Sequence, residues 1–581
     1  MAVEFLKKYI NMYWKKYVFA LVFLTVEAIC DLMQPTIMSR IIDRGVNSKN
    51  MDYVLYMGGI MLSVTAIGAI AAVARNIISS NVSQRFGSEL RVDLFKKIQS
   101  FSFENIDNFQ GASLMTRLTS DINQVQNFAH GMMRIFVKAP ILCIGSLAMA
   151  IFINPPMSLV LIGVVPIIIA IIFVNMRVSY PFFIKIQKAL DRINTVMREY
   201  LAGIRVVKAF NRFNYEVGRF EVANEELAQV SIKGMRVMSF FNPAITLTIN
   251  IGIVLVIWFG GIRVNTGNMQ VGQIIAFINY MTQILFSLMM LSHVFTMFIR
   301  AKASAERIGE VFLQENSLKD KEKTEELEEF RGRLDFENVT FSYSGAKGEP
   351  VLKNISFTCY PGETIGIIGS TGAGKSSLVN LIPRFYDVIS GSIKIDGIDV
   401  KDINMKILRN IIAMVPQKTM LFTGTILENI KWGNEEASLE ELERVTKISQ
   451  AHEFIVSFPE GYNTILGQGG VNLSGGQKQR ISIARALIKK PKILILDDCT
   501  SAVDVTTEAK IRGALKEYSS KTTCILIAQR ITSVMRADRI VVIDNGSVMG
   551  IGTHEELMNG CSVYRDIFRS QIGEEEMLGG Y

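Results

Sequence analysis

Residues 369–376 read GSTGAGKS and follow the apolar run of residues 364–368. A glycine-rich loop between a buried strand and a helix lets backbone N–H groups approach phosphate closely. The lysine places a positive charge at the β- and γ-phosphates, and the serine hydroxyl is a ligand for Mg²⁺. Because a helix is expected to begin near Lys375, this part of the chain is predicted to be an α/β nucleotide-binding domain.

Two later segments extend this prediction. Residues 492–496 form a second apolar run that ends in Asp497 and Asp498, and a carboxylate there is expected to hold the magnesium site. Residues 473–477 read LSGGQ and open a second helix, whose free N–H groups can bind an anion. A single domain cannot bring both anion sites to one phosphate.

The chain as a whole is too apolar for an ordinary soluble enzyme. Of the 581 residues, 49% are hydrophobic, and the mean hydropathy is +0.27. Six apolar segments approach or exceed the roughly 20 residues that span a bilayer. They run near residues 17–38, 54–79, 136–153, 159–178, 245–262 and 274–298. We therefore expect a six-helix membrane domain in contact with the lipid bilayer.

The joins between these segments predict the orientation of the chain. The joins near residues 81–134 and 179–243 are long, helical in pattern and rich in Arg and Lys, whereas the other three are short. By the positive-inside rule the long joins are cytoplasmic, and both termini are expected on that side of the cell (plasma or inner) membrane. A helix that continues about 20 residues beyond the bilayer projects some 30 Å, far enough to reach a second domain.

Composition also excludes several classes. The net charge of +8 is modest for this length and suits loops facing anionic lipid better than a nucleic-acid groove, so no nucleic-acid partner is expected. The six cysteines lack the spacing of a zinc site or a disulfide framework. We expect them to be buried as small apolar side chains.

Four residues are candidates for the substrate path. Glu27 and Asp31 lie one turn apart on the first span, where ionisable groups are costly. They either attract a cationic substrate or form a structural pair with a basic group. Met289 and Met290 on the last span suit varied apolar ligands or simply face lipid.

Taken together, these motifs resemble a half-transporter of the ATP-binding cassette (ABC) exporter family, and the resemblance covers nearly all of the chain. It implies an all-α six-helix transmembrane domain fused to an α/β P-loop nucleotide-binding domain with an antiparallel β subdomain. The corresponding ranges are residues 1–310, a charged linker at 311–333, and residues 334–581. ATP and Mg²⁺ are the implied cofactors.

The resemblance also implies a role for each motif. Two nucleotide-binding domains close head to tail. Each ATP then lies between the Walker A loop of one chain, here residues 369–376, and the signature LSGGQ of the other. Asp497 stands at the Walker B position. Tyr343 stacks on adenine, and Ser376, Gln417 and Asp497 hold Mg²⁺. The nucleotide-binding set is Tyr343, Gly369, Ser370, Thr371, Gly372, Ala373, Gly374, Lys375, Ser376, Ser377, Gln417 and Asp497; the set that serves the partner's ATP is Leu473, Ser474, Gly475, Gly476, Gln477 and the D-loop residue Asp504; the coupling set is Phe103, Asn105, Phe210, Arg212 and Phe213.

This chain departs from the family at two catalytic positions. Active members carry a Glu after the Walker B Asp and a His on a later loop, and here these positions hold Asp498 and Gln529. Because Asp is one methylene shorter than Glu, its carboxylate lies about 1.5 Å closer to the backbone. A misplacement near 1 Å costs on the order of 10²-fold in rate. Gln529 cannot carry a positive charge. Residues 467–470, GQGG, also replace a usual acidic-basic pair.

The expected function is therefore that of one subunit of a heterodimeric exporter of hydrophobic or amphipathic small molecules, of the multidrug type. Its own Walker site would mainly bind ATP, and its intact signature would serve the hydrolytic site of a second half-transporter. The alternatives are a slowly hydrolysing homodimer with Asp498 as base, a lipid flippase, an importer of iron chelates, and a nucleotide-sensing regulatory subunit without transport.

Overall fold

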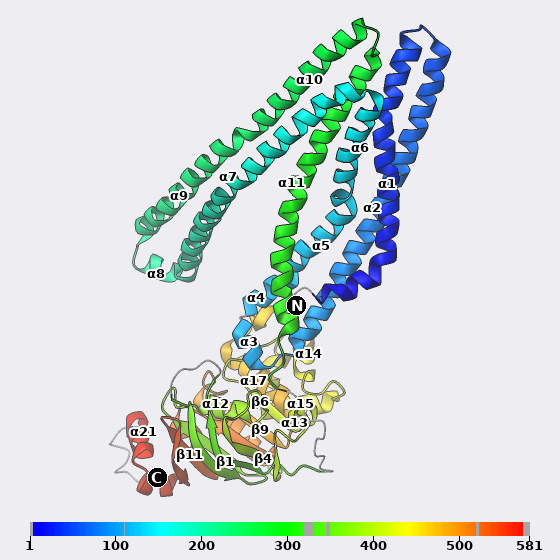
Figure 1. The fold of residues 1–581 in the computed structure, drawn as a ribbon. Helices are drawn as coiled ribbons and strands as arrows, with labels where there is room; N and C mark the ends of the chain where they lie inside the picture. Colours follow the sequence, from blue (N-terminus) through cyan, green and yellow to red (C-terminus); the bar gives the residue numbers. More distant parts are fainter. Residues whose placement is uncertain (1–3, 110, 319–328, 344–348, 519–521, 573–581) are drawn as a thin grey trace. The chain divides into compact units, whose positions relative to one another are not determined.

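The computed structural model describes residues 4–109, 111–318, 329–343, 349–518 and 522–572. The chain divides into two compact units (Figure 1). The first holds Met1–Gln99 and Gly111–Gln314, and the second holds Ser100–Gln110 and Glu315–Tyr581. Of the charged linker expected at 311–333, residues 319–328 lie outside the described residues.

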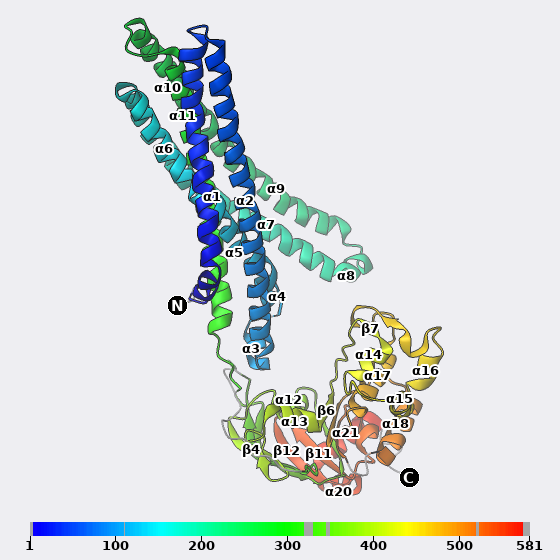
Figure 2. The same cartoon turned by 90° about the vertical axis from the view of Figure 1, so that its right-hand side faces the viewer.

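The first unit is built from long helices. In the described residues, six helical stretches are long and apolar enough to cross a membrane, which confirms the predicted six spans. Figure 2 shows α1 and α2 side by side, and α7 beside α9. The helices are α1 (Leu6–Arg40), α2 (Met51–Gln99), α4 (Gly111–Thr116), α5 (Ile122–Gly131), α6 (Lys138–Ile153), α7 (Pro155–Ala202), α8 (Ile204–Ala209), α9 (Phe213–Ser239), α10 (Phe241–Asn265) and α11 (Val271–Leu313).

Local sequence explains where the third span ends and the fourth begins. Asn154 leaves the helical conformation, and its side chain accepts a hydrogen bond from the Met157 N–H at the start of α7. Pro155 and Pro156 occupy the first turn, where no intrahelical N–H bond is lost. The short predicted join is thus a single capping residue between two helices.

An ionic cluster joins three membrane helices. Glu27 of α1 accepts hydrogen bonds from Arg75 Nε of α2, at 2.8 Å, and from Lys138 Nζ of α6, at 2.6 Å. Lys138 also lies 2.9 Å from Asp31 Oδ2. The side chains of Glu27 and Arg75 are 10% and 4% exposed. The structure therefore realises the structural pairing that was one of the two alternatives for Glu27 and Asp31. Met289 and Met290 of α11 are exposed.

The second unit contains two main sheets and one two-stranded sheet in its described residues. The larger has six strands in the order β12-β11-β3-β10-β9-β6, parallel except for β12. The smaller is antiparallel, in the order β2-β1-β4-β5. The strands are β1 (Leu334–Phe341), β2 (Leu352–Cys359), β3 (Thr364–Gly369), β4 (Ser390–Ile395), β5 (Ile398–Asp399), β6 (Ile412–Val415), β9 (Ile493–Asp497), β10 (Thr523–Ile527), β11 (Arg539–Asp544) and β12 (Ser547–Gly552), with the short pair β7 (Gly424–Thr425) and β8 (Ile465–Leu466).

The parallel strands are buried on both faces, as continuous apolar runs predict. Alternate side chains of β9, such as Ile493 and Ile495, join a core with the smaller sheet, while Leu494 and Leu496 face a core with the helices. The helices of this unit are α3 (Phe103–Phe109), α12 (Lys375–Leu381), α13 (Met405–Ile411), α14 (Ile426–Lys431), α15 (Leu439–Ile448), α16 (His452–Val456), α17 (Gly475–Leu487), α18 (Val505–Tyr518), α19 (Ile531–Val534), α20 (His554–Gly560) and α21 (Ser562–Ile572). The predicted fold class is confirmed, and all six cysteines are free thiols.

The ionic cluster makes a testable prediction about the stability of the membrane unit. Glu27→Gln leaves the buried Arg75 without a counter-charge, and such a loss costs about 3 to 5 kcal/mol. Asp31→Asn removes a partly exposed group with one basic partner and should cost less. Thermal unfolding of the full chain in detergent should show a clearly larger drop for Glu27→Gln, and equal drops would contradict a supporting role for Glu27.

Candidate nucleotide site

The loop between β3 and α12 needs glycine at defined places. Gly372 and Gly374 have φ angles of +84° and +94°, in the left-handed region that glycine tolerates best. A Cβ on Gly369 would lie 1.9 Å from the carbonyl oxygen of Ile543, so only glycine fits beside β11. The loop conformation therefore depends on its glycines, as the sequence indicated.

Lys375 points back into this loop. Its Nζ donates to the carbonyl oxygens of Gly369, at 2.8 Å, and Ser370, at 2.7 Å. Burial lowers the pKa of Lys375, and the nearby Asp498 and Asp497 oppose that shift. The ammonium group lines a cavity of about 230 Å³ together with Thr371, Gly372, Gly374, Ser376, Ser377, Gln417, Asp497, Asp498 and Gln529.

Asp497, the last residue of β9, lies against the loop. Ser376 Oγ donates to Asp497 Oδ1 at 3.1 Å. Burial raises the pKa of Asp497, an effect that the Ser376 hydrogen bond and Lys375 partly offset. A hydroxyl, a carboxylate and the amide oxygen of Gln417 are hard oxygen donors, and Mg²⁺ prefers such donors with phosphate oxygens completing its shell. Ser376, Gln417 and Asp497 therefore fit Mg²⁺.

Asp498 is held by the two glutamines of the site. Its Oδ2 accepts a hydrogen bond from Gln529 Nε2, at 2.8 Å, and from Gln417 Nε2, at 3.1 Å. Asp498 also has a φ angle of +47°, which is uncommon for a residue with a side chain. Its N–H donates to Ile527 O at 2.9 Å, so strand β10 fixes the backbone. The two altered catalytic positions are in direct contact.

Tyr343 lies beside the cavity and does not line it in the described structure. Its hydroxyl is 2.9 Å from Ser377 Oγ at the start of α12. Its ring meets Phe341 and Tyr386 edge-on, with centroids 4.9 Å and 5.2 Å away. One ring edge is therefore packed, while the side chain remains partly exposed.

The signature forms the N-terminus of α17. Ser474 and Gln477 cap this helix reciprocally, since each side chain accepts the other's backbone N–H. Gly476 packs under the D-loop, where an added Cβ would lie 2.8 Å from Ala502 O. Asp504 caps the start of α18 by accepting from Thr507 N–H at 2.9 Å. We call the cavity around Lys375 the Walker cavity. Among its described lining residues, none belongs to the signature, residues 473–477.

The predicted coupling residues fall into two groups. Phe103 and Asn105 lie on or beside α3, which belongs to the nucleotide-binding unit. The Phe103 ring lies 4.6 Å from that of Phe385, and Tyr386 Oη donates to Asp107 Oδ2 at 2.9 Å. Burial first, and then this hydrogen bond, raise the pKa of Tyr386.

The second group sits at the end of the membrane unit near α8. Phe210 and Phe213 are 75% and 62% exposed, and Arg212 precedes α9. Sequence reasoning missed Phe385 and Tyr386, whereas Asp107 lies in the segment of residues 103–110 that was expected to dock on the nucleotide-binding domain. The adjacent aromatic pair after α12 was visible in the sequence, but its contact with α3 depends on tertiary structure.

A P-loop cavity on an α/β unit and six membrane spans on the same chain define an ATP-dependent membrane transporter subunit. Residues 17–288 match the family described as "ABC transporter transmembrane region", and residues 352–501 match the family "ABC transporter". The chain is 41% identical to the uncharacterized ABC transporter ATP-binding protein YfiB of Bacillus subtilis (strain 168), over 96% of each protein. The chain therefore belongs to the ABC transporter family, as an exporter-type half-transporter.

Other relatives are similar over the whole chain. The uncharacterized ABC transporter ATP-binding protein Rv1273c of Mycobacterium tuberculosis is 36% identical over 98% of each chain. The ATP-dependent lipid A-core flippase of Thiobacillus denitrificans is 30% identical over 97% of each. A solved bacterial Atm1-family ABC exporter with ATP bound has the same fold, with a TM-score of 0.80, 24% identity and coverage of 97% of this chain and 99% of that one.

The position of Lys375 predicts a loss of ATP affinity on its replacement. Lys375→Ala removes a charged donor from the cavity, and such hydrogen bonds contribute about 1.5 to 3 kcal/mol, or roughly 10- to 150-fold in affinity. A fluorescent ATP analogue titrated into the full chain should show this weakening. Lys394→Ala, on the exposed strand β4 and paired with Glu337, is the matched control and should bind normally. Equal affinities would place the nucleotide elsewhere.

Proposed function

We propose that this chain is one subunit of a heterodimeric ABC exporter for hydrophobic or amphipathic compounds. Its own Walker site binds ATP and hydrolyses it slowly, and its signature completes the fast hydrolytic site of a second half-transporter. Both termini face the cytoplasm. The observation that carries the proposal is the hydrogen-bonded arrangement of Gln417, Asp498 and Gln529.

A general base needs a carboxylate within hydrogen-bond reach of the attacking water. The Asp498 carboxylate stands closer to its own backbone than a Glu would, and two amide N–H donors already occupy its Oδ2. A water molecule would have to displace one of these donors before it could pass its proton to Oδ2. The same contacts keep the site polar and shaped for nucleotide, so binding is preserved while hydrolysis is slowed.

Gln529 supplies no charge to the developing transition state. A His at this position can become an imidazolium, whereas an amide only donates and accepts hydrogen bonds. The Nε2 of Gln529 donates to Asp498, and the backbone carbonyl of Gln529 accepts a hydrogen bond from Gln571 Nε2 at 2.8 Å. The residue thus supports Asp498 and the C-terminal helix α21.

The intact signature supports a partner of different sequence. Ser474 and Gln477 accept each other's backbone N–H, and Gly475 and Gly476 between them place their N–H groups at the start of α17, where a helix can bind an anion. In this family that anion is the phosphate bound by the other chain. We infer a partner that carries Glu and His where this chain has Asp498 and Gln529. When Mg²⁺ is bound, it neutralises phosphate charge, and Ser376, Gln417 and Asp497 would hold it.

Export of amphipathic compounds is supported by the membrane unit. Its charged residues at the Glu27 cluster compensate one another, two acidic against two basic, so the cluster carries no net charge that would favour a strongly ionic substrate. The remaining path candidates, Met289 and Met290, are adaptable apolar groups.

ATPase measurements on the chain alone, and on the chain copurified with a half-transporter from the neighbouring reading frame, test this function. The pair should hydrolyse ATP on the order of 100-fold faster than the single chain, because only the partner-type site has a correctly placed carboxylate. Asp498→Asn should change the pair's rate less than about twofold, whereas a Glu→Gln change after the partner's Walker B Asp should abolish it.

A variant of the signature provides the matched control. Ser474→Arg removes the N-cap of α17 and should stop hydrolysis by the pair, although it lies on the chain with the slow site. Brisk hydrolysis by this chain alone, lost on Asp498→Asn, would instead establish a homodimer with Asp498 as its base.

A further inference from the structure

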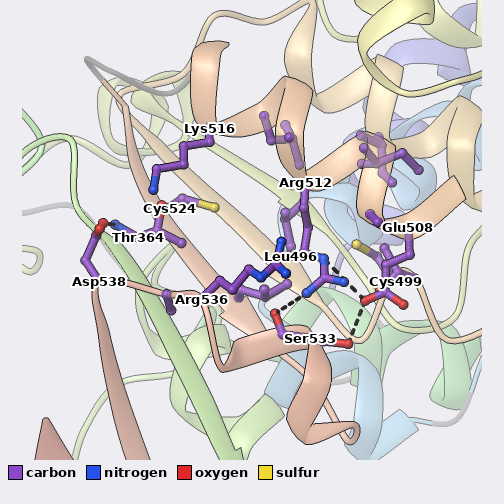
Figure 3. Close-up of a pocket in the computed structure, with 18 residues that line it drawn as sticks. Thr364, Leu496, Cys499, Glu508, Arg512, Lys516, Cys524, Ser533, Arg536 and Asp538 are labelled. Atoms are coloured by element: carbon purple, nitrogen blue, oxygen red, sulfur yellow. Dashed lines mark hydrogen bonds and ion pairs between the residues drawn. The ribbon is translucent and has the colours of Figure 1, made fainter. Parts of the chain in front are cut away.

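A second cavity, of about 280 Å³, lies in the nucleotide-binding unit between strands β9 and β10 on one side and helix α18 on the other (Figure 3). It is lined by residues of α18, by Ser533 near the end of α19 with residues 536–538 after it, and by the segment that follows Asp498. Its floor is apolar and includes Ile483, Leu496 and Leu526, all buried in the core between sheet and helices. No residue of this cavity lines the Walker cavity in the described structure.

The two acidic residues of this cavity are already satisfied. Glu508, 3% exposed, accepts a hydrogen bond from Ser533 Oγ at 2.6 Å. Asp538 Oδ2 accepts from the N–H of Thr364 at 2.8 Å, where β3 begins. The lining therefore holds these two acidic side chains against three basic ones, Arg512, Lys516 and Arg536, and has a net positive charge.

The three basic residues are less completely partnered. Arg512 donates through Nη1 to the carbonyl oxygens of Thr532, at 2.6 Å, and Ser533, at 3.2 Å. Its Nε is buried without a hydrogen-bond partner and lies 3.9 Å from Glu508 Oε1. Lys516 and Arg536 line the cavity with neither a hydrogen bond nor an ion pair to any described residue. Figure 3 shows the three basic side chains distributed around the cavity.

We propose that this cavity binds an amphipathic organic anion, with its apolar body against Leu496 and Leu526 and its charged group between Lys516 and Arg536. Two basic side chains with no partner among the described residues, above an apolar floor, match that chemistry: the anion gains charge-assisted hydrogen bonds, and the body is removed from water. A cationic ligand would meet uncompensated positive charge, and a wholly apolar one would leave the basic groups unpartnered.

The cavity also adjoins the segments that lead into the nucleotide site. Cys499 and Thr500 directly follow Asp498, and both line it. Helix α18 begins one residue after Asp504 of the D-loop, and α19 begins two residues after Gln529. The Glu508–Ser533 hydrogen bond and Arg512 hold these helices together. A ligand wedged between them holds both loops in one arrangement and so slows ATP turnover by the assembled transporter.

Fluorine NMR on the full-length chain in detergent tests the binding. The probe is 4-(trifluoromethyl)cinnamate, and the uncharged probe is its amide. The carboxylate should bind saturably and at least tenfold more tightly than the amide, and saturating ATP should not displace it. Equal binding of carboxylate and amide, or displacement by ATP, would overturn the proposal.

Variants localise the site. Lys516→Glu with Arg536→Glu should weaken carboxylate binding at least tenfold, whereas Lys510→Glu, a charge reversal on the same helix outside the cavity, should not. Unchanged thermal unfolding and ATP binding verify folding, and full carboxylate affinity in the double variant would refute the site. Because binding is measured on the chain alone, the result does not depend on whether the transporter is a heterodimer.

Discussion

The need to surround phosphate with backbone N–H groups at close range governs the second half of this protein. It requires a loop with left-handed glycines, packed so tightly that Gly369 cannot carry a Cβ beside Ile543. It also requires β3 to lie between β10 and β11, because parallel strands deliver their carboxyl ends to the same edge. Asp497 at the end of β9 and Gln529 after β10 reach the loop for this reason alone. The site is thus a consequence of strand order.

The bilayer imposes the corresponding constraint on the first half. Every backbone polar group inside lipid must be satisfied within helices, and every buried charge needs a counter-charge. Glu27 meets that requirement with partners from two other helices, 48 and 111 residues away in sequence. Such a cluster ties α1, α2 and α6 to one another, and its two acidic and two basic side chains compensate each other's charge.

Local patterns allowed the sequence to predict six spans, the strand–loop–helix unit and the signature helix, because periodicity and glycine spacing are properties of neighbouring residues. What depends on distant segments was not predictable. The basic partners of Glu27 and Asp31 were left open, since several basic residues were available. The contact of Tyr386 with Asp107 joins residues 279 positions apart. Likewise, the sequence showed that Asp498 and Gln529 were altered, but their mutual hydrogen bond appears only once β9 and β10 lie side by side.

That hydrogen bond explains why the two alterations belong together. An isolated Asp at position 498 would present its carboxylate to water and retain some strength as a base. With Gln417 and Gln529 both donating to Oδ2, the carboxylate becomes part of a closed hydrogen-bond arrangement that holds the loop after β9 against β10. Such an arrangement favours a site that stays closed around ATP and disfavours one that must hydrolyse ATP quickly. The signature residues, Ser474 to Gln477, keep the family pattern. That difference supports the proposed pairing with a second subunit, in which one interface holds ATP and the other hydrolyses it.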